Sequence, residues 1–207
     1  MENYKELFST PIGIYMVSLP PESKEQIDKG ISQTQLNTPE AWFADILSSF
    51  ENDNQLHRKP EFQELSLLIL SNVLDFCSKL GVDFDKFDIQ CKDMWVNIMM
   101  DRMGIDKHDH VGDFLSTCYY HTVPEGSAPL VLNNPVHDIF IASLYSTISE
   151  ELKTQGKHKH NCSQVNINPQ PGMLVVFPSY LTHGVKVNHS KEPRISFSQN
   201  FIISQKR

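Results

Sequence analysis

Hydrophobic and polar positions change their spacing part-way along the chain. After Pro60, apolar residues recur every three or four positions, and beyond Gly81 they occur in short runs that often alternate with polar residues. The first spacing places one apolar face on a helix, and the alternation places one on a strand. The pattern therefore predicts helices in the first part of the chain and mostly strands in the second.

Two short helices are predicted before the long one. Ser23 can cap a helix that runs to about Leu36. Thr38-Pro39-Glu40 is a second start signal with Pro at the first helical position, so a short helix is expected over 41–50.

Pro60 opens the longest predicted helix, and Gly81 ends it. Its apolar stripe favours packing against a sheet over binding a partner. The stripe consists of Phe62, Leu65, Leu68, Ile69, Val73, Phe76 and Leu80.

Short strands with turns between them account for most of the remaining chain. The strands are predicted over 7–17, 94–100, 114–121, 130–132, 164–167, 173–177, 185–187 and 194–203. Connections are expected over 51–59, 101–107 and 123–129, and residues 136–153 suit either a helix or a strand. Helices followed by many short strands are typical of an α+β fold whose β part is a jelly roll.

Length and composition fit one globular domain over residues 1–207, with helical support at 23–80 and a β core over about 90–207. The chain is 40% hydrophobic and 21% charged, which is ordinary for such a domain. No apolar run approaches the roughly 20 residues that span a membrane. The polar residues 1–7 do not resemble a signal peptide.

Cysteine usage indicates the cellular location of the protein, and its net charge limits the partners it can bind. The four cysteines form no C-x-x-C pair, which predicts reduced thiols in a cytoplasmic protein. The net charge of −7 argues against a non-specific nucleic-acid binder, which needs a basic face. A homodimer could form through an exposed strand edge, although the pattern does not identify that edge.

Histidines supply the candidate chemistry. His108 and His110 are two positions apart, so on an extended strand both imidazoles would point to the same side and could share one metal ion. His183 follows a strand and a turn, and it is the best candidate for a third ligand. The alternative is that these are ordinary surface or core residues. His158 and His160 repeat the spacing in a polar stretch and are interpreted as a solvated loop.

Arg194 begins the last predicted strand. An Arg on the polar face of a buried strand needs an anion, and its planar fork suits a carboxylate. Ser196 points the same way, and Tyr120 could offer its phenol to the same anion. The alternative is an ion pair between Arg194 and an internal Asp or Glu.

Together these residues resemble the 2-oxoglutarate- and Fe(II)-dependent oxygenases, and more narrowly a group found in bacteria and their phages. The resemblance covers the N-terminal strand and most of residues 94–203, and the helices at 23–80 carry little of it. The matching stretches are Leu7-Phe8-Ser9-Thr10-Pro11, Trp95-Val96-Asn97, His108-x-His110-x-Gly112, 115–120, 171–185 and 194–200.

This resemblance implies a double-stranded β-helix that binds Fe(II), uses 2-oxoglutarate as co-substrate and hydroxylates a substrate with release of succinate and CO2. His108 and His183 would be metal ligands. Arg194 would bind the distal carboxylate of 2-oxoglutarate, assisted by Ser196 and Tyr120.

One position departs from the wider family, because His110 stands where the metal-binding carboxylate is expected. Imidazole also suits Fe(II), so His110 can complete the set. If the chain bends after His110, Asp113 could supply the carboxylate instead. His110 is the preferred ligand.

Two other functions fit part of the pattern. A cupin-type dioxygenase with three histidine ligands would need no 2-oxoglutarate and so no Arg194. A non-catalytic jelly-roll module would leave the histidines incidental. Trp95, Asn97 and Met99 could border a pocket, but the core is the favoured interpretation. The substrate, whether a small molecule or a protein, is not indicated.

Overall fold

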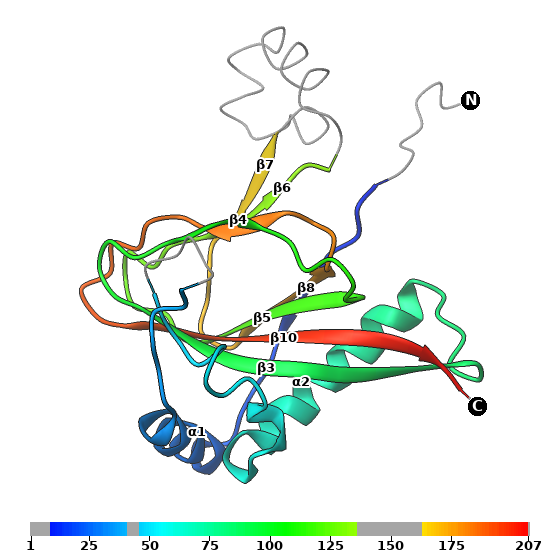
Figure 1. Ribbon diagram of the computed structural model, residues 1–207, viewed down its shortest axis with the longest axis horizontal. Coiled ribbons are helices and arrows are strands. Elements are labelled where there is room, and N and C mark those ends of the chain that lie inside the picture. The colour runs from blue at the N-terminus through cyan, green and yellow to red at the C-terminus, as the bar shows by residue number, and fades with distance from the viewer. Residues whose placement is uncertain (1–8, 41–45, 136–162, 207) are drawn as a thin grey trace, which may run out of the picture.

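Two antiparallel sheets face each other, and two helices cover the outer side of the larger one (Figure 1). The computed structural model of the chain describes residues 9–40, 46–135 and 163–206. This arrangement confirms the expected α+β fold, a double-stranded β-helix with N-terminal helices packed on one sheet.

The elements have the following bounds. The helices are α1 (Pro21–Gln33), the 3-10 helix η1 (Leu56–Arg58) and α2 (Pro60–Lys79). The six-stranded sheet has the order β1 (Gly13–Met16), β8 (Met173–Pro178), β5 (Leu115–Thr122), β10 (Arg194–Gln205), β3 (Phe87–Met99) and β2 (Leu47–Ser48). The four-stranded sheet has the order β4 (Ile105–His108), β9 (His183–Val185), β6 (Leu130–Asn133) and β7 (Gln164–Ile167).

Alternation along the central strands separates two apolar cores. Phe197 and Phe201 of β10 join Tyr119 of β5 in the core against the helices. There the ring of Phe62 on α2 lies 5.5 Å from that of Phe197. Tyr120, the next residue on β5, points the other way into a second core between the sheets. One face of the six-stranded sheet thus packs against the helices, and the other faces the space between the two sheets.

The predicted helix over 41–50 is wrong where the structure describes it. Leu47 and Ser48 form strand β2, which pairs with the edge of β3. The backbone N–H of Val96 on β3 donates to Ser49 Oγ at 3.2 Å. Covering that strand edge overrides the local helix signal. Residues 41–45 lie outside the described part of the chain.

Other boundaries shift for identifiable reasons. The first strand is limited to Gly13–Met16, because the same register would set Pro11 opposite Pro178, and neither has an N–H to donate. Helix α1 starts at Pro21 without a side-chain cap, and Ser23 instead bonds Glu64 of α2.

The connection predicted over 101–107 contains strand β4, and β3 begins at Phe87, well before the predicted 94. The strand predicted at 185–187 is displaced toward the N-terminus, to His183–Val185. The ambiguous residues 136–153 and the loop with His158 and His160 lie outside the described residues.

Within the described ranges, neither helix is long and apolar enough to cross a membrane. Cys77, Cys91 and Cys118 are free thiols, and Cys162 lies outside the described residues.

Truncating Phe62 should destabilise the fold, because its fully buried ring fills the core between α2 and β10. We expect Phe62→Ala to lower the free energy of unfolding by about 3–5 kcal/mol in urea titrations. Leu67→Ala, at a 59% exposed position of the same helix, should change it by less than about 0.5 kcal/mol. Equal losses in the two variants would contradict this account of the core.

Candidate metal centre

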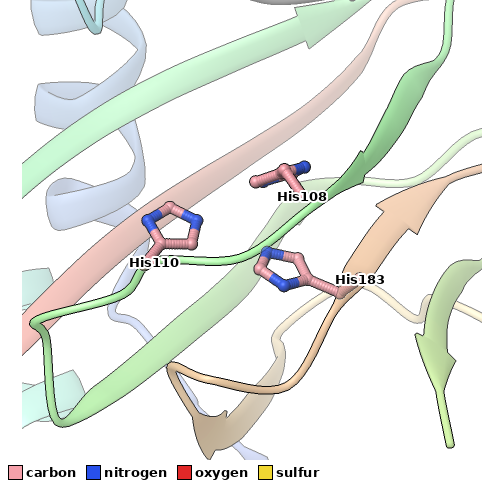
Figure 2. A group of neighbouring side chains, drawn as sticks. All are labelled: His108, His110 and His183. Carbon is pink, nitrogen blue, oxygen red and sulfur yellow. The ribbon is translucent and has the colours of Figure 1, made fainter. Parts of the chain in front are cut away.

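Three imidazoles converge at one end of the space between the sheets. His108 ends β4, His183 begins β9, and the two are directly paired in the register of these strands. His110 comes from the loop after β4. One nitrogen from each ring lies within 4.8 Å of the others (Figure 2), a spacing that one metal ion could bridge.

The reason for this convergence differs from the predicted one. Strand β4 ends at His108, so His110 does not share a strand face with it. The chain bends instead. The N–H of His110 donates to Ser179 O at 3.0 Å, which ties the loop to the turn that precedes His183.

The bend does not bring Asp113 to the metal position. Its carboxylate pairs with Lys92 at 2.7 Å, and it is not among the converging ligand atoms. The structure therefore assembles His108, His110 and His183 and leaves the alternative carboxylate aside.

Backbone carbonyls fix the orientation of two of the rings. Nδ1 of His108 lies 2.9 Å from Asp106 O, and Nδ1 of His183 lies 2.9 Å from Leu181 O. A carbonyl only accepts, so Nδ1 must carry the proton in both rings. The lone pair of a neutral ring then lies on Nε2, the tautomer that a metal ligand of this kind needs.

Burial keeps two of the imidazoles, those of His110 and His183, neutral. It lowers the pKa of His183 to about 3, and the nearby His108 adds to this effect. Burial lowers the pKa of His110 to about 4, again with a contribution from His108. Neutral imidazoles can bind a cation without first losing a proton.

Arg194 lies deeper in the same cavity and is only 1% exposed. Nη1 donates to Ser196 Oγ at 3.2 Å and lies 3.3 Å from Met99 Sδ. The guanidinium stacks 4.9 Å from the centre of the Tyr120 ring. Nε and Nη2 of Arg194 and the hydroxyl of Tyr120 have no hydrogen-bond partner among the described residues.

No described carboxylate pairs with Arg194, so the alternative of an internal ion pair has no support in the described ranges. A buried, unneutralised guanidinium is costly. With an unpartnered phenol beside it, it forms a pocket suited to a small carboxylate.

The histidines and Arg194 line one cavity, which also reaches residues on β3. Trp95 and Asn97 line it as well. Both are also buried, as is Met99, so the core interpretation holds for their burial, and Trp95 and Asn97 in addition border the cavity. Alternation along the strand alone could not say which side of the sheet held the cavity. Asn200, on the same face of β10 as Arg194, also lines it and was not assigned a role from sequence.

A family model described as "Putative 2OG-Fe(II) oxygenase" matches residues 93–200, from β3 through much of β10. The chain belongs to this family. This 2OG-Fe(II) oxygenase therefore uses Fe(II) as its metal and 2-oxoglutarate as co-substrate. A search of the curated proteins found no match to its sequence.

Solved structures share the fold of this 2OG-Fe(II) oxygenase. A prolyl-4-hydroxylase from Pseudomonas putida is 12% identical, with a TM-score of 0.58 over 96% of this chain and 94% of that one. HygX from Streptomyces hygroscopicus, with nickel and 2-oxoglutarate bound, is 9% identical, with a TM-score of 0.57 over 93% and 82%. A Trichoplax adhaerens prolyl hydroxylase in complex with a peptide fragment is 12% identical, with a TM-score of 0.58 over 92% and 83%. At these identities the likeness establishes the fold alone.

The buried histidines predict that stability depends on pH. The pKa of His183 is about 3 in the folded chain, against a usual 6.5. Between these values the unfolded chain binds more protons, so the free energy of unfolding should fall as the pH drops from about 6.5. Urea titrations at several pH values, with a chelator present, would measure the slope.

His183→Gln should reduce this slope. His189→Gln, which changes an exposed histidine, should leave it unchanged. The same slope in the wild type and in His183→Gln would count against a neutral, buried His183.

Proposed function

We propose that this oxygenase hydroxylates its substrate at an Fe(II) ion held by His108, His110 and His183, with 2-oxoglutarate anchored by Arg194. The observation that carries the proposal is the buried guanidinium of Arg194, which faces the histidine cavity without a carboxylate partner among the described residues. A dicarboxylate co-substrate supplies the missing anion.

The ligand set is chemically suitable for Fe(II). Backbone carbonyls hold the rings of His108 and His183. The low pKa values of His110 and His183 keep these two rings neutral. Imidazole is a good ligand for Fe(II), although three neutral ligands leave the ion one charge more positive than a set with a carboxylate.

The protein's own part in the reaction is to bind, orient and exclude water. Arg194 can hold the distal carboxylate through Nε and Nη2, the two atoms left without partners, with the Tyr120 hydroxyl beside them. Ser196 holds Nη1 and so orients the fork. When bound, Fe(II) and 2-oxoglutarate supply oxygen activation, and the hydroxylated product leaves with succinate and CO2.

The three-histidine set is the one feature that favours a second candidate, a dioxygenase of the cupin type that needs no 2-oxoglutarate. Such chemistry has no use for Arg194 and Tyr120. The non-catalytic module expected as a third possibility is set aside by the family match.

The proposal also includes the cellular location of the protein and its oligomeric state. The free thiols of Cys77, Cys91 and Cys118 support a cytoplasmic location. A homodimer stays a prediction, and β1 offers an edge strand for it, with Ile14 and Met16 exposed.

Anaerobic titration with Fe(II) and 2-oxoglutarate tests the metal and co-substrate together. We expect a weak visible charge-transfer band that needs both components. His183→Ala should abolish Fe(II) binding and the band, whereas His189→Ala, at an exposed position, should retain both. Metal binding without a band would favour the cupin-type candidate, and full Fe(II) affinity in His183→Ala would refute the ligand assignment.

Replacing Arg194 tests the co-substrate pocket. Losing one partner of a buried, hydrogen-bonded charge pair costs about 2–5 kcal/mol, so Arg194→Ala should raise the KM for 2-oxoglutarate by about 30-fold or more. Arg194→Lys should rescue little, because an ammonium lacks the planar fork. Arg102→Gln, at an exposed arginine, is the matched control. An unchanged KM in Arg194→Ala would exclude the proposed role.

A further inference from the structure

The third imidazole, His110, differs from the other two in how it is held. Carbonyl oxygens bind Nδ1 of His108 and His183, and a carbonyl cannot donate a hydrogen bond. The partner of His110 is the side-chain amide of Asn200, whose Nδ2 lies 3.0 Å from Nδ1 of the ring. An amide offers a donor and an acceptor, so it can support either tautomer of the ring.

The orientation present in the structure does not suit metal binding by His110. Here Nδ2 of Asn200 faces Nδ1 of His110 and donates to it. A neutral imidazole carries one proton, which must then lie on Nε2 and block the lone pair on the metal side. Half a turn of the amide would present Oδ1 instead, move the proton to Nδ1 and free Nε2.

The surroundings of Asn200 allow this turn. Asn200 lies on β10 directly between Asp93 of β3 and Ser116 of β5. Ser116 Oγ donates to Asn200 Oδ1 at 2.9 Å, and it lies 2.8 Å from Ser179 Oγ, where either hydroxyl can donate. A hydroxyl donates or accepts, so Ser116 can serve both orientations of the amide.

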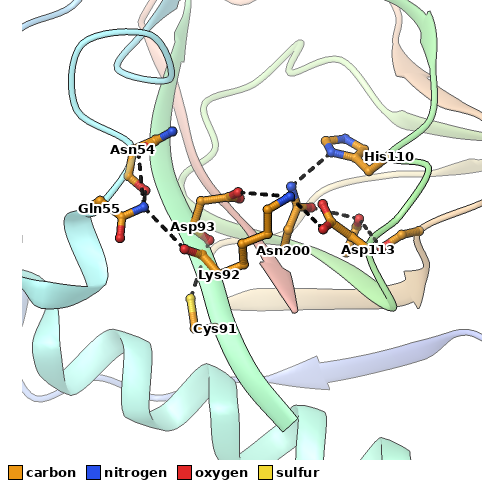
Figure 3. Close-up of polar contacts among 10 residues, drawn as sticks. Asn54, Gln55, Cys91, Lys92, Asp93, His110, Asp113 and Asn200 are labelled. Carbon is orange, nitrogen blue, oxygen red and sulfur yellow. Dashed lines mark hydrogen bonds and ion pairs between the residues drawn. The ribbon is translucent and has the colours of Figure 1, made fainter. Parts of the chain in front are cut away.

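Asp93 lies opposite Asn200 on the neighbouring strand β3, and its carboxylate forms an ion pair with Lys92 at 3.9 Å (Figure 3). This carboxyl is only 7% exposed. Burial raises its pKa to about 6, and the Lys92 charge and the Asn200 amide oppose that rise. A carboxylate attracts the N–H side of an amide and repels its oxygen. Asp93 therefore biases Asn200 toward donating to His110.

We propose that Asn200 is the positioning residue that decides whether His110 binds the metal, and that Asp93 sets the bias between the two amide orientations. The inference rests on the proposed function for the metal itself. It makes the centre a set of two fixed ligands and one adjustable ligand. Asn200 contacts no reacting atom and acts through the ring of His110.

Exchanging the two side chains tests this directly. In Asp93→Asn combined with Asn200→Asp, the residue at 200 can only accept, so Nδ1 of His110 must carry the proton. Ring 15N shifts in histidine-labelled protein with a chelator should show the Nε2–H tautomer of His110 in the wild type and the Nδ1–H tautomer in the exchanged variant. Co(II) should bind the exchanged variant about tenfold more tightly. Asp93→Asn alone should shift both readouts in the same direction.

The controls separate a positioning role from a structural one. Circular dichroism should show the exchanged variant folded, and a packing role for Asn200 predicts no gain in Co(II) affinity. An unshifted tautomer and unchanged Co(II) affinity in both variants would overturn the role of Asn200. His110→Ala in the exchanged background tests the ligand itself, and unchanged affinity there would refute the proposed ligand set, whatever the tautomer of His110.

Discussion

Strand β10 lies between β3 and β5, so each of its side chains must point either toward the helices or toward the cavity. Phe197 and Phe201 take the helix side and help to close the main core. Arg194, Ser196 and Asn200 take the cavity side. The same hydrogen-bonded ladder that gives the sheet its stability thus holds the groups that face the co-substrate and the third imidazole. A shift of one residue in its register would exchange the two sets.

Burial gives the two ends of the cavity opposite electrostatic properties. At the mouth it keeps His110 and His183 uncharged, so neither ring repels a cation. At the inner end the guanidinium of Arg194 stays buried without an anion among the described residues. Burying polar groups without partners costs free energy at both ends of the cavity. A metal bound to the imidazoles and a dicarboxylate bound to Arg194 would supply the missing partners. The unsatisfied polar groups of the cavity therefore favour ligand binding over maximal stability.

The replacement of a carboxylate ligand by His110 also alters what surrounds the metal. A carboxylate needs no tautomer, but an imidazole binds only when its other nitrogen carries the proton. The row formed by Asp93, Asn200 and Ser116 across three strands is placed to control that proton. An acidic side chain is thus still present beside the centre, although it acts through Asn200 and not through a bond to the metal.

The pattern of the sequence determined the long helix, most of the strands and the shared direction of Arg194 and Ser196 on the last strand, because periodicity reports local geometry directly. It also singled out His108, His110, His183 and Arg194. Tertiary structure alone decided that 47–48 is a strand, since the exposed edge of β3 outweighed the local helix signal. It decided as well that His110 reaches the centre through a bend, and that its partner is Asn200. These contacts join positions far apart in the chain, and no local spacing encodes such pairings.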